Sequence, residues 1–336
     1  MNKHANLSIF IPNEGCENRC IYCDQQAVSG VYKIPAPEEV ERLCDERLPW
    51  PIEQHDTEIA FFGGSFTAID RRYMVSLLDA AYRFVREGRA RGIRVSTRPD
   101  AIDGISLDIL KSFGVTSIEL GAQSTDDMVL LDNQRGHTRD DIIEAVSLIK
   151  KSGFSLGLQM MIGMYGEEDF ETAALKTAAD FIGLRPDTVR IYPTVVLRRT
   201  RLEHLYHIGA YKPLNLTQAV EIVSKLLMLF DNNGISVIRT GLHSDSELQE
   251  NIVAGPFHPA FGELAMAGVY RIMIEEKVRE SQSSKVTVSV AAGRKSQAAG
   301  QKLGNIKYFE KLGVRLDIVE SSELKGFEIK LSRCSE

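Results

Sequence analysis

The 336-residue sequence lacks any run of about 18 apolar residues, the length that a membrane-spanning helix needs. It also lacks a small-residue cleavage site after its first apolar stretch, so we expect no secretion signal. Basic residues are not in excess, because 40 Lys and Arg stand against 46 Asp and Glu. The resulting net charge of -6 leaves only local basic patches for binding nucleic acid. We therefore expect a cytoplasmic protein that has no membrane partner.

Cysteine is scarce and clustered. Three of the five cysteines, Cys16, Cys20 and Cys23, fall within eight positions. Such clustering does not suit a disulfide framework and fits metal ligation in a reducing compartment. Cys44 follows Leu43 on an amphipathic segment and is expected to be a small core residue, while Cys334 lies in the tail.

Short apolar runs alternate with longer amphipathic segments, which is typical of βαβ units and a parallel sheet. The strand candidates are Leu7–Ile11, Glu58–Phe62, Ile93–Thr97, Ser117–Leu120, Ser155–Met161 and Thr188–Tyr192. The helix candidates are Pro37–Leu48, Tyr73–Arg86, Leu107–Phe113, Asp140–Lys151, Phe170–Ile182 and Thr217–Asn232. Six strand-helix repeats predict an α/β barrel or an open crescent, and Ile235–Ile238 is a candidate for one further edge strand.

The regular alternation of strands and helices ends beyond Gly241. We therefore divide the chain into a barrel at 1–245 and a small C-terminal α/β cap at 246–336. The elements expected in the cap are a helix through Ala265–Ile274, strand Val286–Val290, a helix over Lys295–Leu312, and strands Val314–Val319 and Phe327–Leu331. These elements are too few for a large independent core, so the cap is expected to pack on the barrel.

The cysteine cluster follows the first strand, where a barrel places its active-site loops. Three thiolates hold three irons of a cubane cluster and leave the fourth iron open. S-adenosylmethionine (SAM) chelates such an iron through its amino and carboxylate groups, and an electron from the cluster then breaks its sulfonium bond. The alternative is a zinc site completed by Cys44 or a histidine.

A paired glycine follows the second strand at Gly63 and Gly64, before Ser65. Without side chains, the backbone here approaches a ligand closely and offers groups that receive the SAM ammonium. The alternative is a tight strand-to-helix connection.

The motifs CENRCIYCDQ, FFGGSFTA, STRPD, ELGAQS, NQRGHT and RIYPTVVLRRT occur in order. They resemble the landmarks of the radical SAM superfamily, most closely the radical SAM half of the Elongator catalytic subunit family, with a weaker likeness to oxygen-independent coproporphyrinogen oxidase. The resemblance covers Leu7 to Pro213. It implies a partial, TIM-like (β/α)6 barrel that binds a four-iron, four-sulfur (4Fe-4S) cluster and SAM.

The resemblance also implies roles for ten residues. Cys16, Cys20 and Cys23 are expected to bind the cluster and Gly63, Gly64 and Ser65 the methionine part of SAM, while Ser96, Gln123, Arg135 and Gln159 are expected at its ribose or carboxylate. Ser96 replaces an acidic residue of the Elongator relatives, and Gln159 replaces an Asp of the coproporphyrinogen relatives. Arg135 suits the SAM carboxylate; the alternative is a salt-bridge residue of the barrel rim.

The function implied is reductive cleavage of SAM to a 5'-deoxyadenosyl radical that abstracts hydrogen from a substrate the sequence does not identify. A tRNA base is one class suggested by the Elongator likeness, and a small metabolite is another. After the barrel we find no Gly-rich turn of the acetyl-CoA-binding type that the acetyltransferase domain of those relatives would bring, so we do not expect their acetylation reaction. The partner expected is an electron donor such as flavodoxin or ferredoxin. The alternative function is a non-catalytic zinc or iron-sulfur module for binding or sensing.

Further residues are ambiguous in the sequence. Tyr192 points toward the barrel mouth or into the core, and Arg198 and Arg199 contact substrate or form a solvated rim. His137 and His243 occupy polar loops, where a histidine donates to substrate or is simply exposed.

Overall fold

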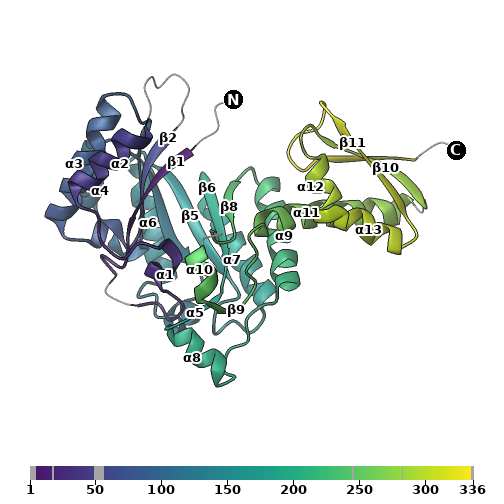
Figure 1. Cartoon of the computed structure of the whole chain (residues 1–336), viewed down its shortest axis with the longest axis horizontal. Coiled ribbons are helices and arrows are strands. Elements are labelled where there is room, and N and C mark those ends of the chain that lie inside the picture. Colours follow the sequence, from purple (N-terminus) through teal and green to yellow (C-terminus); the bar gives the residue numbers. More distant parts are fainter. Residues whose placement is uncertain (1–4, 17–18, 49–56, 244–245, 282, 334–336) are drawn as a thin grey trace.

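The computed structural model describes residues 5–16, 19–48, 57–243, 246–281 and 283–333. Its main feature is a parallel seven-stranded sheet with the order β1-β2-β3-β4-β5-β6-β8. The strands are β1 Ala5–Ile11, β2 Thr57–Gly63, β3 Gly92–Thr97, β4 Val115–Gln123, β5 Ser155–Ile162, β6 Thr188–Pro193 and β8 Ser236–Thr240. The sheet curls into a partial barrel (Figure 1), which confirms the predicted fold, including the additional edge strand.

Helices cover the convex face of the sheet (Figure 1). They are α2 Pro37–Arg47, α3 Arg71–Arg86, α4 Gly104–Ser112, α6 Arg139–Lys151, α7 Phe170–Leu184 and α9 Leu216–Asn232. Alternate strand residues such as Phe61 and Val95 pack on these helices and are at most 1% exposed. Thr138 and Asp141 form a capping box at the start of α6, which satisfies amide groups that the helix leaves free.

The residues between these apolar positions face the concave side of the sheet, because side chains alternate along a strand. Several of them are charged: Glu58 on β2, Arg94 on β3, Glu119 on β4 and Arg190 on β6 are all at most 9% exposed. The inside of this barrel is therefore polar, unlike the branched apolar layers that usually fill a (β/α) barrel.

A second, three-stranded sheet lies apart from the first, with α11 (Phe261–Ser281) between them (Figure 1). It contains β10 Lys285–Ala291, β11 Arg315–Ser321 and β12 Ile329–Arg333, in the order β11-β10-β12. Helix α11 serves both parts, since Ala265 and Val269 belong to the main core while Tyr270 and Ile274 belong to the core of the small sheet. The division at 245/246 stays a prediction.

The single helix predicted over Lys295–Leu312 is wrong. The chain instead forms α12 (Lys295–Ala299), a 3-10 turn and α13 (Gly304–Lys311). Lys302 and Leu303 adopt φ of 52° and 61°, which no right-handed helix accommodates. The side-chain amide of Asn305 donates to the carbonyl of Ala298 at 2.9 Å, so it satisfies a carbonyl group at the end of α12.

Short elements escaped the sequence analysis because they span too few residues to show a period. They are α1 Gln25–Ser29, α5 Asp127–Asp132, α8 Arg201–His207, α10 Ser246–Asn251 and the antiparallel pair β7 Val196–Leu197 and β9 Ile252–Ala254. Across the described ranges, no helix is long and apolar enough to cross a membrane.

Candidate active site

A cavity of about 350 Å³ opens at the carboxyl ends of the strands. Parallel strands bring these ends to one edge, so residues far apart in the chain meet there. The cavity is lined by all ten residues that the resemblance singled out: Cys16, Cys20, Cys23, Gly63, Gly64, Ser65, Ser96, Gln123, Arg135 and Gln159.

The cysteine loop is held to the next loop by a glutamine. Gln25 donates from its amide to the carbonyl of Gly63 at 2.7 Å and accepts from the backbone N–H of Asn13 at 2.5 Å. Asp24 caps the short helix α1, accepting from the N–H of Ala27 at 3.0 Å. A backbone hydrogen bond from Cys23 to Cys20 (3.1 Å) closes the turn that carries two of the thiols. The loop is therefore shaped by its own hydrogen bonds.

The three thiols are half-buried and lie close enough together for their charges to interact. Burial raises the pKa of Cys23 to about 12, with Cys20 and Cys16 adding to the rise and Arg135 opposing it. Coordination to iron would replace the thiol proton, which leaves to solvent, because the thiolate is the form that binds a metal. Among the described residues, no group of three His, Cys, Asp or Glu side chains is arranged to hold a single metal ion. A cubane cluster carries its three thiolates on three different irons.

Arg135 is 7% exposed and faces the cysteines. Its Nη1 donates to the Sγ of Cys20 at 3.0 Å, and its Nη2 donates to the carbonyl of Gly121 at 2.5 Å. The alternative of a rim salt-bridge residue is therefore wrong. A buried guanidinium beside the thiols stabilises them when they are ionised, so this donor set fits a thiolate-ligated cluster.

The paired glycines are required by the cysteine loop itself. A Cβ at Gly64 would lie 1.9 Å from the carbonyl oxygen of Glu14, and one at Gly63 would lie 2.8 Å from that of Ile11. Gly63 also has a φ of 111°. The N–H of Ser65 donates to Glu14 at 2.9 Å, so backbone packs directly on backbone here. The glycines bring two cavity loops together, a role that differs from the tight strand-to-helix connection considered as the alternative.

Three of the predicted SAM contacts lie on neighbouring strands: Ser96 on β3, Gln123 on β4 and Gln159 on β5. Gln159 donates from its amide to the side-chain oxygen of Gln123 at 3.1 Å. Gln123 has a φ of 67°, a conformation that is strained for a non-glycine residue, and it stands where the register between β4 and β5 shifts. This distortion of the strand lies at the edge of the cavity that the Gln123 side chain lines.

Beneath these residues lies an ionic network that the sequence analysis missed. Arg94 pairs with Glu58 at 2.8 Å and lies 3.8 Å from Glu119, which pairs with Arg190 at 2.8 Å. Burial raises the pKa of Glu119, with Arg190 and Arg94 opposing the rise. Burial acts the same way on Glu58, but Arg94 and two hydroxyls outweigh it and lower that pKa. The available signal was a charged residue within each apolar strand.

The two loop histidines differ, because His137 is buried whereas His243 is exposed at the cavity. His137 is 5% exposed, and its Nε2 lies 3.1 Å from the carbonyl of Ala122. Burial, with Arg135 adding to it, lowers the pKa of His137 to about 4. His243 lines the cavity, as does Tyr192, whereas Arg198 is exposed.

A family model described as the radical SAM superfamily matches residues 10–178, about half of the chain. This chain belongs to the radical SAM superfamily. A second model, described as the radical SAM C-terminal domain, matches residues 186–270. Members of the superfamily use a 4Fe-4S cluster and SAM, which are therefore the cofactors of this radical SAM protein.

Relatives of this radical SAM protein include a tRNA uridine(34) acetyltransferase of Methanocaldococcus jannaschii, 30% identical over 50% of the chain and 34% of the relative. Human Elongator complex protein 3 is 34% identical over 51% of this chain and 35% of its own length. The chain thus spans about a third of the length of these relatives. The archaeal Elp3 structure from Methanocaldococcus infernus shares the fold, with a TM-score of 0.63 and 23% identity over 83% of this chain and 64% of that one.

Proposed function

We propose that the cavity is the site where this radical SAM enzyme removes hydrogen from its substrate, and that the substrate is a base of tRNA. The observation that carries the site is the meeting of ten residues from five strand ends and their loops around one cavity. When bound, the cluster and SAM supply one-electron chemistry, fed by a donor such as flavodoxin or ferredoxin.

The residues of the chain have separable tasks in this proposal. Cys16, Cys20 and Cys23 hold the cluster, and Arg135 stabilises the Cys20 thiolate through its N–H. Ser96, Gln123 and Gln159 offer hydroxyl and amide groups for the ribose and carboxylate of SAM, while Gly63, Gly64 and Ser65 offer backbone groups for its methionine part. Apolar neighbours in the cavity wall exclude water, which protects a reactive species formed there. These are Phe10, Phe62, Met161, Val195, Leu197 and Leu242.

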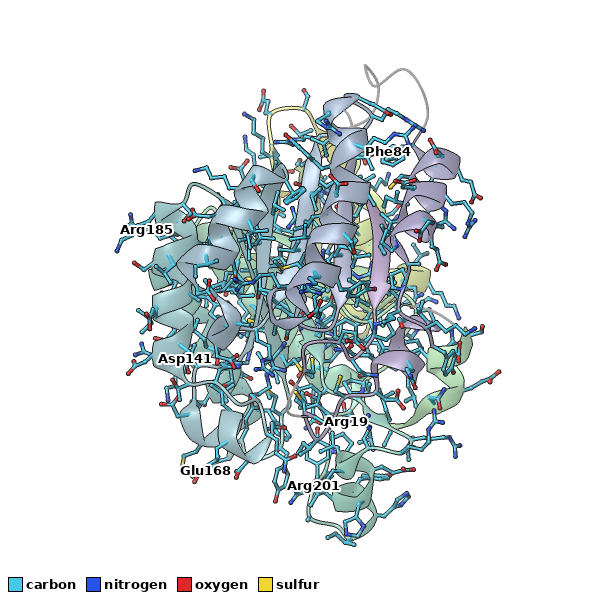
Figure 2. All side chains as sticks on the ribbon, turned by 90° about the vertical axis from the view of Figure 1, so that its left-hand side faces the viewer. Arg19, Phe84, Asp141, Glu168, Arg185 and Arg201 are labelled. Carbon is cyan, nitrogen blue, oxygen red and sulfur yellow. The ribbon has the colours of Figure 1, made fainter. Side chains whose placement is uncertain are left out.

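The tRNA proposal is supported by the relatives named for tRNA uridine(34) and by a local basic surface. A second hollow, of about 450 Å³, shares the cysteine loop with the first cavity, and its lining includes Arg19, Arg199 and Arg201. All three arginines are exposed, and Figure 2 shows Arg19 and Arg201 close together below the strands. Asp24 lies 3.5 Å from Arg199 and balances one of the three charges. Exposed guanidinium groups are suited to the phosphates of a nucleic acid.

Activity is tested first. The protein is reconstituted anaerobically with iron and sulfide and reduced, and release of 5'-deoxyadenosine from SAM is measured. Cys20→Ala is expected to abolish release. Cys44→Ala is the matched control, because Cys44 is fully buried on α2 and away from the cavity. Absence of release from the wild type, with zinc bound in place of iron, would support the non-catalytic metal module instead.

Substrate class is tested by binding to unfractionated tRNA at several salt concentrations. Arg199→Gln with Arg201→Gln is expected to weaken binding and to reduce the salt slope by roughly one for each phosphate that the variant no longer neutralises. The control pair is Arg139→Gln with Arg185→Gln, two exposed arginines on other elements (Figure 2 labels Arg185). Equal binding by both double variants would exclude this surface from tRNA recognition.

A further inference from the structure

We propose that Arg190 and Tyr192 form a subsite that binds an acceptor oxygen of the substrate, either a carboxylate or a ring carbonyl. The inference rests on the proposed function, because it assigns the part of the same cavity that receives the substrate. Both residues lie on β6 and line the cavity.

Arg190 is held on three sides. Its guanidinium carbon lies 4.9 Å from the centre of the Phe62 ring, and its Nε lies 2.8 Å from a carboxylate oxygen of Glu119. Its Nη1 donates to the hydroxyl of Tyr192 at 3.3 Å. The side chain therefore has one orientation before any substrate arrives, which lowers the entropic cost of binding.

Two donors of Arg190 make no described hydrogen bond: Nε, which is fully buried beside Glu119, and Nη2, which is not fully buried. Arginine has five N–H donors in a fixed plane. In the described part of the chain no hydrogen bond engages Nη2, although the residue as a whole is only 9% exposed. Nη2 is also not among the fully buried unsatisfied atoms, so it retains access to the cavity that Arg190 lines. A mostly buried cation thus presents an unused donor to the cavity.

Stability alone does not account for this cation. Glu58, Arg94, Glu119 and Arg190 place two negative and two positive charges in the barrel interior. Well-packed apolar residues of similar volume often replace such buried pairs at no cost, or with a gain in stability. The end of the network that lines the cavity is Glu119 and Arg190. We infer that the role of these buried charges is to fix the Nη2 donor of Arg190 at the cavity.

The position of the subsite suits a substrate beside SAM. In the sheet register Gln159 lies opposite Arg190, and Met161 lies opposite Tyr192. The subsite therefore begins one strand beyond the last predicted SAM contact, and hydrogen transfer requires the two molecules to be neighbours. A planar guanidinium fork with a phenol hydroxyl beside it complements an oxygen that accepts two hydrogen bonds. Phe62 and Phe10 add flat apolar surface for a planar group.

Two variants test the subsite. Tyr192→Phe removes only a hydroxyl, and the double variant Glu119→Gln with Arg190→Gln removes both charges of a pair so that neither is left buried alone. Tyr82→Phe is the matched control, because that ring packs on Phe113 on the helical side of the sheet. Anaerobic calorimetry on the reconstituted holoenzyme measures Kd for SAM and for two probes, benzoate as a planar carboxylate and uridine as a ring carbonyl.

The expected result is that a probe bound by the wild type binds about tenfold more weakly to the double variant, equivalent to about 1.4 kcal/mol. Tyr192→Phe weakens it several-fold, Tyr82→Phe has no effect, and the Kd for SAM changes less than twofold throughout. A response of uridine identifies the oxygen as a ring carbonyl and agrees with a tRNA base. A response of benzoate alone identifies a carboxylate, which supports the subsite but contradicts tRNA as the substrate.

Three results would overturn the subsite while leaving the proposed function intact: neither probe binds the wild type, the variants bind the probe as the wild type does, or SAM affinity falls in parallel with probe affinity. The last result would assign Arg190 to the cofactor. A wild type that binds iron but fails to cleave SAM would overturn the proposed function, and the subsite with it.

Discussion

The Nη1 of Arg135 donates a hydrogen bond to the Sγ of Cys20, a residue 115 positions earlier in the chain, at 3.0 Å. The contact joins the segment after α5 to the cysteine loop after β1. Hydrogen bonds and charge at the sulfurs are among the factors that set the reduction potential of an iron-sulfur cluster.

Replacing this donor should therefore change the potential of the reconstituted protein. In Arg135→Gln the positive charge and the Nη1–H···S bond are both removed, so we expect a more negative midpoint potential. A redox titration followed by electron paramagnetic resonance measures it, with Arg139→Gln as an exposed control. An unchanged potential at full iron occupancy would show that Arg135 only shapes the loop.

The glycine turn gives a sharper contrast. In Gly64→Ala the new methyl group would lie 1.9 Å from the backbone oxygen of Glu14, so the loop must shift. We expect the free energy of unfolding to fall by at least about 2 kcal/mol and the iron content to be reduced. Gly183→Ala is the control, because Gly183 lies in α7 with nothing within 4 Å. That change should stabilise the protein by up to about 1 kcal/mol. Chemical denaturation measures both values.

The buried charges predict an asymmetry between two arginines. Arg94→Met leaves Glu58 and Glu119 without the cation that they share. We expect the free energy of unfolding to fall by about 3 to 5 kcal/mol. Arg139→Met breaks an exposed pair with Asp180 and should cost less than about 1 kcal/mol. Equal losses in urea denaturation would contradict the burial of the network.

His137 predicts a pH dependence. Its pKa of about 4 in the folded state lies below the value of about 6.5 in the unfolded chain. The unfolded chain therefore binds the extra proton first, and the contribution of neutral His137 is complete above pH 6.5 and is lost as pH falls toward 4. The loss amounts to about 3 kcal/mol.

Urea denaturation of wild type and His137→Gln between pH 7 and pH 4 isolates this group. The difference between the two curves should change by about that amount as the pH falls. Parallel curves would mean that His137 is solvated.

The sequence was sufficient for the sheet, which follows from local patterns. The family resemblance supplied the ten residues that line the cavity, and their contacts with the cofactors stay predictions. Alternating apolar runs mark the strands, and the C-x3-C-x2-C spacing, the paired glycines and Arg135 stand in recognisable motifs. The whole set lines one cavity.

The sequence was not sufficient where a residue depends on a distant partner. Glu119 and Arg190 are 71 positions apart, and only the register of three strands brings them together. The burial of His137 depends on packing against the end of β4, and the break in the predicted C-terminal helix depends on the left-handed backbone at Lys302 and Leu303. The helical period does not reveal the break, although Gly300, whose φ is 77°, ends α12 and is the available sequence signal.

Helix α11 has a consequence for folding. Its first half is buried with the barrel and its second half with the small sheet, so neither part completes its core without the same helix. A helix in a protein draws most of its stability from such packing and not from its intrinsic propensity. Loss of either core therefore weakens the helix that the other core requires, and heating should melt the whole chain in one cooperative transition.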